Sequence, residues 1–151
     1  MSLFLSSFTN KIDAKGRVAV PATFRGAVNG DAFPGVVLFR SFTGKCIEGM
    51  SMSRMERLAD ATDQMNVFDS KLDELTAMLF ADARQLQFDV TGRIVIPSDL
   101  LEHANIKGDA VFVGRGKSFQ IWEPSAFSEM QADAMMKLQK EKPNLVISDK
   151  K

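Results

Sequence analysis

The sequence has one cysteine and one histidine among its 151 residues, and this scarcity excludes several kinds of site. Cys46 has no partner for an intramolecular disulfide, and it cannot build a cysteine-based zinc cluster. His103 alone cannot supply a multi-histidine metal site. We also find no cluster of nucleophile, base or metal ligands of the kind that an enzyme needs. The sequence therefore predicts no metal, no cofactor and no catalytic residue.

Long apolar runs and an excess of either charge are missing as well. No run approaches the roughly 18 apolar residues that span a bilayer, and the first eight residues lack the basic and apolar regions of a signal peptide. We therefore expect a soluble, cytoplasmic protein without a membrane partner. Basic and acidic residues number 19 each, so the net charge is zero, which taken alone counts against a nucleic-acid partner.

A ten-residue motif occurs twice and organises the chain. Residues 12–21 read IDAKGRVAVP and residues 88–97 read FDVTGRIVIP, so Asp, Gly, Arg and Pro recur at an offset of 76. A weaker likeness continues from residues 36–48 to residues 110–123. Each repeat unit is too small to bury a core alone, so we expect the two units to pack on each other.

Each unit predicts the order strand, tight turn, strand, short helix, strand, turn, strand. In the first unit, strands over residues 8–12 and 17–20 flank a turn that Asp13 opens and Gly16 closes. Aspartate at the start and glycine at the end are typical of such turns, and we interpret the two strands as a hairpin. The second unit predicts the same hairpin around its own turn.

Prolines predict where the short helices begin. Proline suits the first turn of a helix, and we expect helices over residues 22–28 and 98–104, directly after Pro21 and Pro97. Glycines then close these helices, and further turns join the second pair of strands in each unit. These closing glycines and turns are Gly30, Gly108, residues 43–44 and residues 114–116.

Two segments outside the repeat also predict helices. Between the units, a capping box formed by Ser53 and Glu56 predicts a helix to about Gln64, and leucines at 72, 75 and 79 predict a second one. After the second unit, apolar residues recur at helical spacing from Pro124 up to Lys140. We expect the chain beyond residue 143 to fray.

The two Asp-x-x-x-Arg turns, each followed by a proline-started helix, resemble the duplicated motif of the MraZ family over about residues 5–140. The resemblance implies two SpoVT-AbrB modules, related to the swapped-hairpin barrels of AbrB and MazE-type proteins. The expected fold class is α+β, mainly β, with a duplicated barrel of this swapped-hairpin or double-psi-like kind. The expected domains are module 1 (residues 5–50), a helical linker (51–82), module 2 (83–126) and a C-terminal amphipathic helix with its tail (127–151).

The same resemblance implies a function. MraZ proteins are bacterial transcriptional regulators, so the resemblance implies sequence-specific binding of double-stranded DNA at promoter direct repeats. It implies repression of the division and cell-wall gene cluster, including the family's own promoter. It also implies a ring-like homo-oligomer and a nucleoid-associated location.

The aspartates and glycines of the repeated turns are interpreted as structural. An aspartate at the first position of a turn accepts hydrogen bonds from N–H groups two or three residues further on, which assigns this role to Asp13 and Asp89. A bulge at such a turn needs the backbone freedom of glycine, which assigns Gly16 and Gly92 to the structural motif.

Arginines and lysines of the repeated motif are the candidate DNA contacts. Each turn arginine could fold back onto its aspartate or project toward a ligand; with the resemblance added, Arg17 is favoured as a contact, while Arg93 is either a contact or structural. Residues 1–48 hold six basic and three acidic residues, whereas residues 49–84 hold four and seven. The basic excess therefore lies around the first turn. The predicted DNA-binding residues are Lys11, Lys15, Arg17, Arg25 and Arg93.

Two other functions compete with DNA binding. An antitoxin-like module that binds a protein partner is the alternative, although antitoxins usually carry one short module and a long disordered tail. Enzyme chemistry is disfavoured as well. Residues 116–118 read Gly-Lys-Ser, as at the end of a phosphate-binding loop, but Val111 occupies the position where that loop needs its first glycine. Cys46 is expected to be a buried thiol, and His103 is expected to stabilise the end of its helix.

Overall fold

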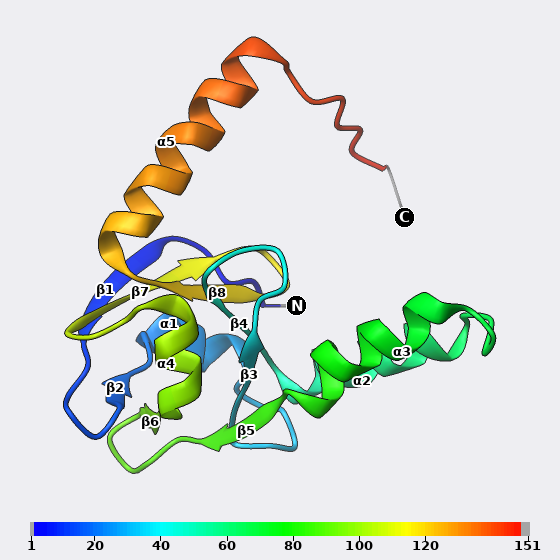
Figure 1. Cartoon of the computed structure of the whole chain (residues 1–151). Coiled ribbons are helices and arrows are strands. Elements are labelled where there is room, and N and C mark those ends of the chain that lie inside the picture. Colours follow the sequence, from blue (N-terminus) through cyan, green and yellow to red (C-terminus); the bar gives the residue numbers. More distant parts are fainter. Residues whose placement is uncertain (1, 149–151) are drawn as a thin grey trace.

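The strands of the two repeat units combine into shared sheets. The computed structural model describes residues 2–148 as a mixed α/β chain, with helices placed around and beyond the strands (Figure 1). One antiparallel sheet has six strands in the order β1-β7-β8-β4-β3-β5, and β2 and β6 form a separate two-stranded ribbon. In chain order the elements are β1 (Ser7–Lys11), β2 (Arg17–Ala19), α1 (Ala22–Ala27), β3 (Gly35–Arg40), β4 (Ile47–Met50), α2 (Met52–Asp63), α3 (Ser70–Thr76), the π-helix η1 (Ala77–Ala81), β5 (Arg84–Gln87), β6 (Arg93–Val95), α4 (Ser98–Ala104), β7 (Asp109–Gly114), β8 (Phe119–Trp122) and α5 (Pro124–Lys140).

Strand pairing crosses repeatedly between the two units. β1 pairs with β7, β4 pairs with β8, and β3 pairs with both β4 and β5, always antiparallel. The ribbon also takes one strand from each unit, because β2 pairs with β6. The main buried cluster likewise contains residues of both units. The expectation that the two units pack on each other is therefore confirmed.

The predicted hairpins at the repeated motif are wrong. β1 and β2 do not form a ladder: they share one isolated bridge, between Ile12 and Val18, and a side-chain hydrogen bond from Nδ2 of Asn10 to the carbonyl of Ala19 at 2.7 Å. β2 pairs with β6 instead, which places Val18 opposite Ile94 and buries both side chains in the shared core. The predicted pairs β3–β4 and β7–β8 are confirmed.

Phe24 of α1 lies at the centre of the main core. Its side chain is fully buried, and its ring centroid lies 5.2 Å from that of Phe4 and 5.3 Å from that of Phe119. The rings of Phe8 and Phe112 lie 5.7 and 6.2 Å away, both nearly perpendicular to it. Edge-to-face contacts of this kind are favourable. The helix after the first turn is thereby held against strands from both ends of the chain.

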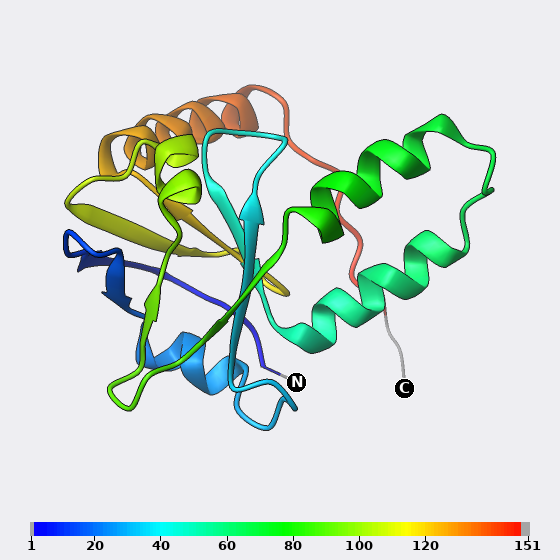
Figure 2. The same cartoon turned by 60° about the horizontal axis from the view of Figure 1, so that its bottom comes forward.

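α2, α3 and η1 form a helical linker that projects from the sheet (Figure 2). Its base is apolar: Met55 of α2 and Leu79 of η1 are buried against Val37 and Phe39 of β3. Toward the far end of the linker, Phe68 is 91% exposed. The linker is therefore fixed to the sheet at one end only.

Two predicted helix caps differ from the structure. α2 begins after Ser51, whose Oγ accepts a hydrogen bond from the N–H of Arg54 at 3.1 Å, so the capping box expected at Ser53 is wrong. α4 ends at Asn105 with φ of 54°, so Gly108 does not close it. Asparagine tolerates this left-handed conformation better than most residues, which allows the helix to end before the glycine.

α5 packs on the sheet with its first half only. Phe127 is buried beside Trp122 and Cys46, and Met130 packs against the same cluster. Further along the helix, Met135, Met136 and Leu138 are more than half exposed. The helix continues to Lys140 as predicted, and residues 141–148 form neither helix nor strand.

Candidate functional site

The two Asp-x-x-x-Arg turns lie at opposite ends of the β2–β6 ribbon. β2 and β6 run antiparallel, and the first turn leads into β2 while the second leads into β6. The carbonyl of Gly16 accepts a hydrogen bond from the N–H of Ile96 at 2.8 Å, and the carbonyl of Gly92 accepts one from Val20 at 3.1 Å. The ribbon therefore presents two similar ends, each made by both units.

The Asp13 carboxylate holds the first turn together. Its Oδ1 accepts hydrogen bonds from the N–H groups of Lys15 at 3.0 Å and Arg17 at 2.9 Å, and its Oδ2 lies 2.6 Å from Nε of Arg17. The backbone hydrogen bond from Arg17, aided by the others, lowers the pKa of Asp13. Gly16 has φ of +83°, and a Cβ there would lie 2.5 Å from the carbonyl oxygen of Ile96. This turn therefore needs both its aspartate and its glycine.

The Asp89 carboxylate repeats this arrangement in the second turn. Its Oδ1 accepts hydrogen bonds from the N–H groups of Thr91 and Arg93, both at 2.9 Å, and from Oγ1 of Thr91 at 2.8 Å. Its Oδ2 lies 2.9 Å from Nε of Arg93. The backbone hydrogen bond from Arg93 is the main cause that holds the pKa of Asp89 well below its usual range. The hydroxyl of Thr91 thus donates a hydrogen bond that has no counterpart in the first turn, where Lys15 occupies this position.

Arg17 and Arg93 both fold back onto their aspartates, which decides between the two orientations that the sequence left open. Each side chain is nevertheless about two-fifths exposed, at 41% and 43%. The carboxylate engages only Nε of each guanidinium, and within residues 2–148 neither guanidinium has a second side-chain acceptor. The terminal nitrogens can therefore donate hydrogen bonds to an acceptor outside the chain.

The two arginines share one face of the ribbon. Side chains alternate between the faces of a strand, and the central pair, Val18 and Ile94, is buried. In the register, Arg17 lies opposite Val95 and Arg93 lies opposite Ala19, so these four residues form the outward face. The arginines occupy diagonal corners of that face, with small or apolar side chains between them.

Arg25 lies at the second turn, although it follows the first turn in sequence. Its Nη1 donates to the carbonyl of Val20, and a Cβ on Gly92 would lie 2.8 Å from its guanidinium. The antiparallel pairing of β2 with β6 explains this position of Arg25. It places the end of β2 beside the start of β6, and α1, which carries Arg25, begins just after β2. The expectation that Arg25 joins Lys15 and Arg17 around the first turn is therefore wrong.

The predicted basic residues divide between the two ends of the ribbon. Lys15 is exposed in the first turn, while Arg25 and Arg93 lie at the second. Lys11 is exposed at the end of β1, where it lies opposite Asp109 of β7. Positive charge therefore does not gather at the first turn alone.

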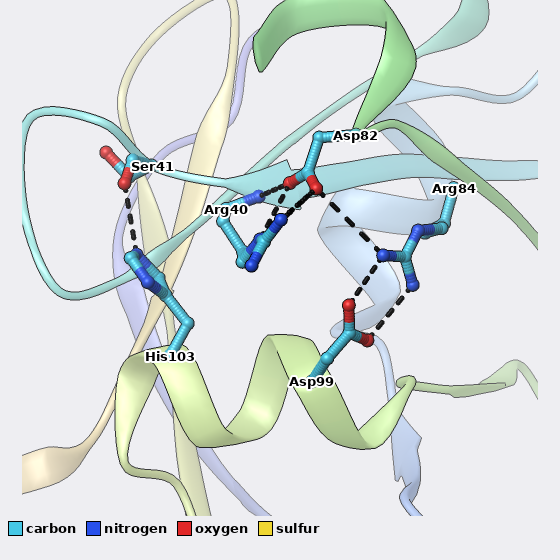
Figure 3. A network of polar contacts seen from close by, with 6 residues as sticks. All are labelled: Arg40, Ser41, Asp82, Arg84, Asp99 and His103. Carbon is cyan, nitrogen blue, oxygen red and sulfur yellow. Dashed lines mark hydrogen bonds and ion pairs between the residues drawn. The ribbon is translucent and has the colours of Figure 1, made fainter. Parts of the chain in front are cut away.

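A network of ion pairs was not foreseen from the sequence (Figure 3). Asp82, 7% exposed, accepts hydrogen bonds from the N–H, Nε and Nη2 of Arg40. Arg84 lies 4.0 Å from the same carboxylate and donates two hydrogen bonds to Asp99 of α4, at 2.6 and 3.0 Å. The hydrogen bonds from Arg40 lower the pKa of Asp82. The network joins β3, the end of the linker and α4.

His103 lies near this network, and both His103 and Cys46 serve the fold. Nε2 of His103 lies 3.0 Å from the carbonyl oxygen of Ser41 and 3.2 Å from that of Gly44, so it bonds to the β3–β4 turn (Figure 3). His103 lies in the last turn of α4, as expected, and these contacts with the β3–β4 turn were not predicted. Cys46 is buried as expected, and desolvation raises the pKa of its thiol to about 11.

Two other features are absent from residues 2–148. In this part of the chain, no three His, Cys, Asp or Glu side chains gather closely enough to hold a metal ion. No helix among the described residues is both long enough and apolar enough to cross a membrane.

Known proteins similar to this chain share nearly its whole length. Three curated relatives, each named transcriptional regulator MraZ, illustrate this. The protein from Pelagibacter ubique strain HTCC1062 is 42% identical over 135 residues, 89% of this chain and 87% of the relative. Those from Rickettsia bellii strain OSU 85-389 and Rickettsia peacockii strain Rustic are each 38% identical, over 89% and 94% of this chain and 90% and 95% of the relatives.

The duplicated turns and the shared ribbon define a protein of two related units that complete each other's sheets. The family model for the MraZ protein, described as antitoxin-like, matches residues 79–146, which include the second unit. With the relatives above, this match shows that the chain belongs to the MraZ family.

Proposed function

We propose that this chain is a sequence-specific DNA-binding transcriptional regulator. The names of its relatives support a role in transcription. The observation that carries DNA binding is the outward face of the ribbon, where Arg17 and Arg93 are each held at Nε by an aspartate. A two-stranded ribbon can enter the major groove, where arginine pairs with the O6 and N7 atoms of guanine.

The remaining basic residues support contacts with the DNA backbone. Lys15 is exposed at one end of the ribbon, and Arg25 lies at the other. Contacts with phosphate fix the position of a protein on DNA, while contacts with base edges select the sequence. In the proposed complex, Arg17 and Arg93 read bases, and Lys11, Lys15 and Arg25 contact phosphates.

The wider assignment follows the family. We infer two SpoVT-AbrB modules of the swapped-hairpin kind, supported by strand pairs that cross between the units. The protein is proposed to bind promoter direct repeats as a ring-like homo-oligomer and to repress the division and cell-wall gene cluster, including its own promoter. Several ribbons on adjacent repeats would raise affinity through multivalency. Such a protein acts in the cytoplasm, on the nucleoid.

Substitution of Arg17 tests the proposed base contact. Arg17→Lys keeps the charge but loses the planar guanidinium, and Arg17→Ala loses both. Both variants are expected to weaken binding to a duplex from the upstream region by roughly tenfold or more, which corresponds to about 1–3 kcal/mol for a lost base contact. Fluorescence anisotropy measures the dissociation constants. Lys45→Ala, at an exposed lysine in the β3–β4 turn, is the control and should bind like wild type.

Equal affinity of wild type and Arg17→Ala would remove that residue from the interface.

An antitoxin-like module that binds a protein partner is the second candidate, favoured by the description of the matching family model. It predicts a purified chain without sequence preference on DNA and a protein partner whose binding Arg17→Ala leaves unchanged.

A further inference from the structure

An open apolar groove lies between the β3–β4 turn and the helical linker. We call it the linker groove; it has a volume of about 410 Å³ and is lined by Phe42, Lys71, Glu74, Leu75 and Met78. Phe42 is 57% exposed there, and the two charged residues, which pair with each other at 3.4 Å, lie among the apolar ones. The ribbon and its turns contribute nothing to this lining. The groove is therefore separate from the proposed DNA interface.

A second apolar feature follows α5. Leu145, Val146 and Ile147 are consecutive and are 86%, 81% and 89% exposed. Figure 1 shows that α5 leads away from the sheet and that the chain then bends back on the side of the linker. Single exposed apolar residues are ordinary, but a contiguous exposed run indicates an interaction site.

Charge complements the two features. Residues 51–82, which form the linker, contain three basic and seven acidic residues. Residues 137–142, which lead to the apolar run, contain three lysines and one glutamate. Lys137 pairs with Asp133 at 2.9 Å, so the basic excess nearest the run comes from Lys140 and Lys142. Opposite charges beside two apolar surfaces steer them toward each other. The same charges disfavour contacts between two linkers or between two C-terminal runs.

The two features do not meet within one chain. More than four-fifths of each residue in the run stays exposed, so the run does not fill the groove of its own copy. The 17-residue helix α5 is a rod of roughly 25 Å, and its packed first half fixes the direction in which it carries the run. A second copy of the chain is therefore the occupant that the observations favour.

We propose that residues 145–147 of one copy insert into the linker groove of a second copy. Each copy then offers one groove and one run, so the contact is heterologous and can close into a ring after several subunits. This inference rests on the proposed self-association and names the contact that produces it. It also gives the linker a role, because the linker supplies one wall of the groove.

Cross-linking between differently tagged copies tests this contact. One copy carries Ile147→Cys and the other carries Met78→Cys, while the native Cys46 is buried and protected. Oxidation is expected to give a disulfide-linked pair that contains both tags. The control replaces Met78→Cys by Val90→Cys, a fully exposed apolar position in the second turn, and should give no such pair. Absence of the mixed pair, or an equal yield with the control, would overturn the proposal.

Mass measurement by light scattering separates this contact from self-association in general. Val146→Asp and Met78→Asp are each expected to lower the particle mass toward that of a single chain, because each places a charge in the apolar contact. Asn144→Asp, next to the run, should leave the mass unchanged. A monomeric wild type would overturn the proposed self-association together with this contact. An oligomeric wild type that both aspartate variants leave intact would overturn the contact alone.

Discussion

The smallest unit that matters is one carboxylate in each repeated turn. Asp13 and Asp89 each accept two backbone N–H groups with one oxygen and an arginine Nε with the other. One residue therefore shapes the turn and orients the guanidinium beside it. Preorientation of this kind reduces the entropy that a long side chain loses when it binds a ligand.

The pH dependence of stability is expected to report on Asp89. Its pKa is lowered in the folded state, so its stabilising effect is complete above the unfolded pKa, about 3.9, and is lost as pH falls below it. Asp89→Asn should therefore unfold at lower urea concentration than wild type at pH 7, and the difference should shrink in acid. Urea titrations at several pH values measure it.

Asp60→Asn, at an exposed aspartate of α2, is the matched control for this titration. It should leave the free energy of unfolding nearly unchanged at every pH. A difference between Asp89→Asn and wild type that persists undiminished in acid would contradict the proposed role of the carboxylate.

A comparison of two glycines distinguishes the cost of a positive φ from the cost of a steric clash with an added Cβ. Gly16 and Gly116 have φ of +83° and +84°, but only at Gly16 would an added Cβ meet backbone, 2.5 Å from the carbonyl oxygen of Ile96, whereas Gly116 faces open space. Gly116→Ala should cost roughly 1–2 kcal/mol of folding free energy. Gly16→Ala should cost roughly 1–3 kcal/mol more, because a backbone clash is added. Equal losses in urea unfolding would show that the first turn can move aside.

Among the elements, the linker is held to β3 by apolar packing and by charge, and the charged network extends to the second unit. Asp82 follows η1, Arg40 ends β3, and Arg84 begins β5 and reaches Asp99 of α4 (Figure 3). A buried carboxylate keeps its charge only when hydrogen bonds replace water. The network therefore fixes where the linker ends and how α4 lies beside β3.

Removal of Arg40 is expected to weaken this connection. Arg40→Ala deletes the side-chain hydrogen bonds to the buried carboxylate of Asp82 and should lower the free energy of unfolding by clearly more than the loss of an exposed ion pair. Lys71→Ala breaks an exposed ion pair with Glu74 and should cost at most ~0.5 kcal/mol. Chemical denaturation of both variants gives the comparison. A loss for Arg40→Ala no larger than that for Lys71→Ala would contradict the structural role of the network.

For the molecule as a whole, zero net charge conceals an uneven distribution. Residues 1–48 carry three more basic than acidic residues, and residues 49–84 carry three more acidic than basic ones. The proposed DNA-binding ribbon and the acidic linker are thus separate regions of a neutral chain. An oligomer would repeat the basic region, so a neutral particle can still present several basic sites to DNA.

The salt dependence of DNA binding is expected to distinguish the two kinds of basic residue. Lys15→Ala should reduce the slope of log K against log salt by about one for each site occupied and should weaken all sequences alike. Arg17→Ala should instead reduce the preference for the specific duplex over a scrambled one. Titrations at several salt concentrations on both duplexes measure these effects. Identical behaviour of the two variants would contradict the assignment of separate roles.

Local chemistry was predictable from the sequence, whereas long-range placement was not. The turn that Asp13 opens and Gly16 closes follows from residue preferences, and so does the helix after Pro97. The partner of β2 does not, because Val18 fits a hairpin as well as it fits pairing with Ile94. For the same reason, nothing in the order of residues indicates that α1 begins beside the second turn.

The polar network shows the same limit. Arg40 and Asp82 are 42 residues apart, and no spacing rule connects two residues at that distance in the chain. Their pairing depends on the end of η1 meeting the end of β3 in the folded protein. Leucine spacing predicted the second linker helix, but it carries no information about which charged residue the end of that helix meets.

Footprinting on the DNA upstream of the protein's own gene tests the central claim most directly. Wild type is expected to protect short, regularly spaced direct repeats, and Arg17→Ala is expected to lose this protection at the same protein concentration. Lys45→Ala should reproduce the wild-type pattern. The absence of any protected site for wild type, or the same repeats protected equally by Arg17→Ala, would contradict the proposal that the β2–β6 ribbon reads DNA.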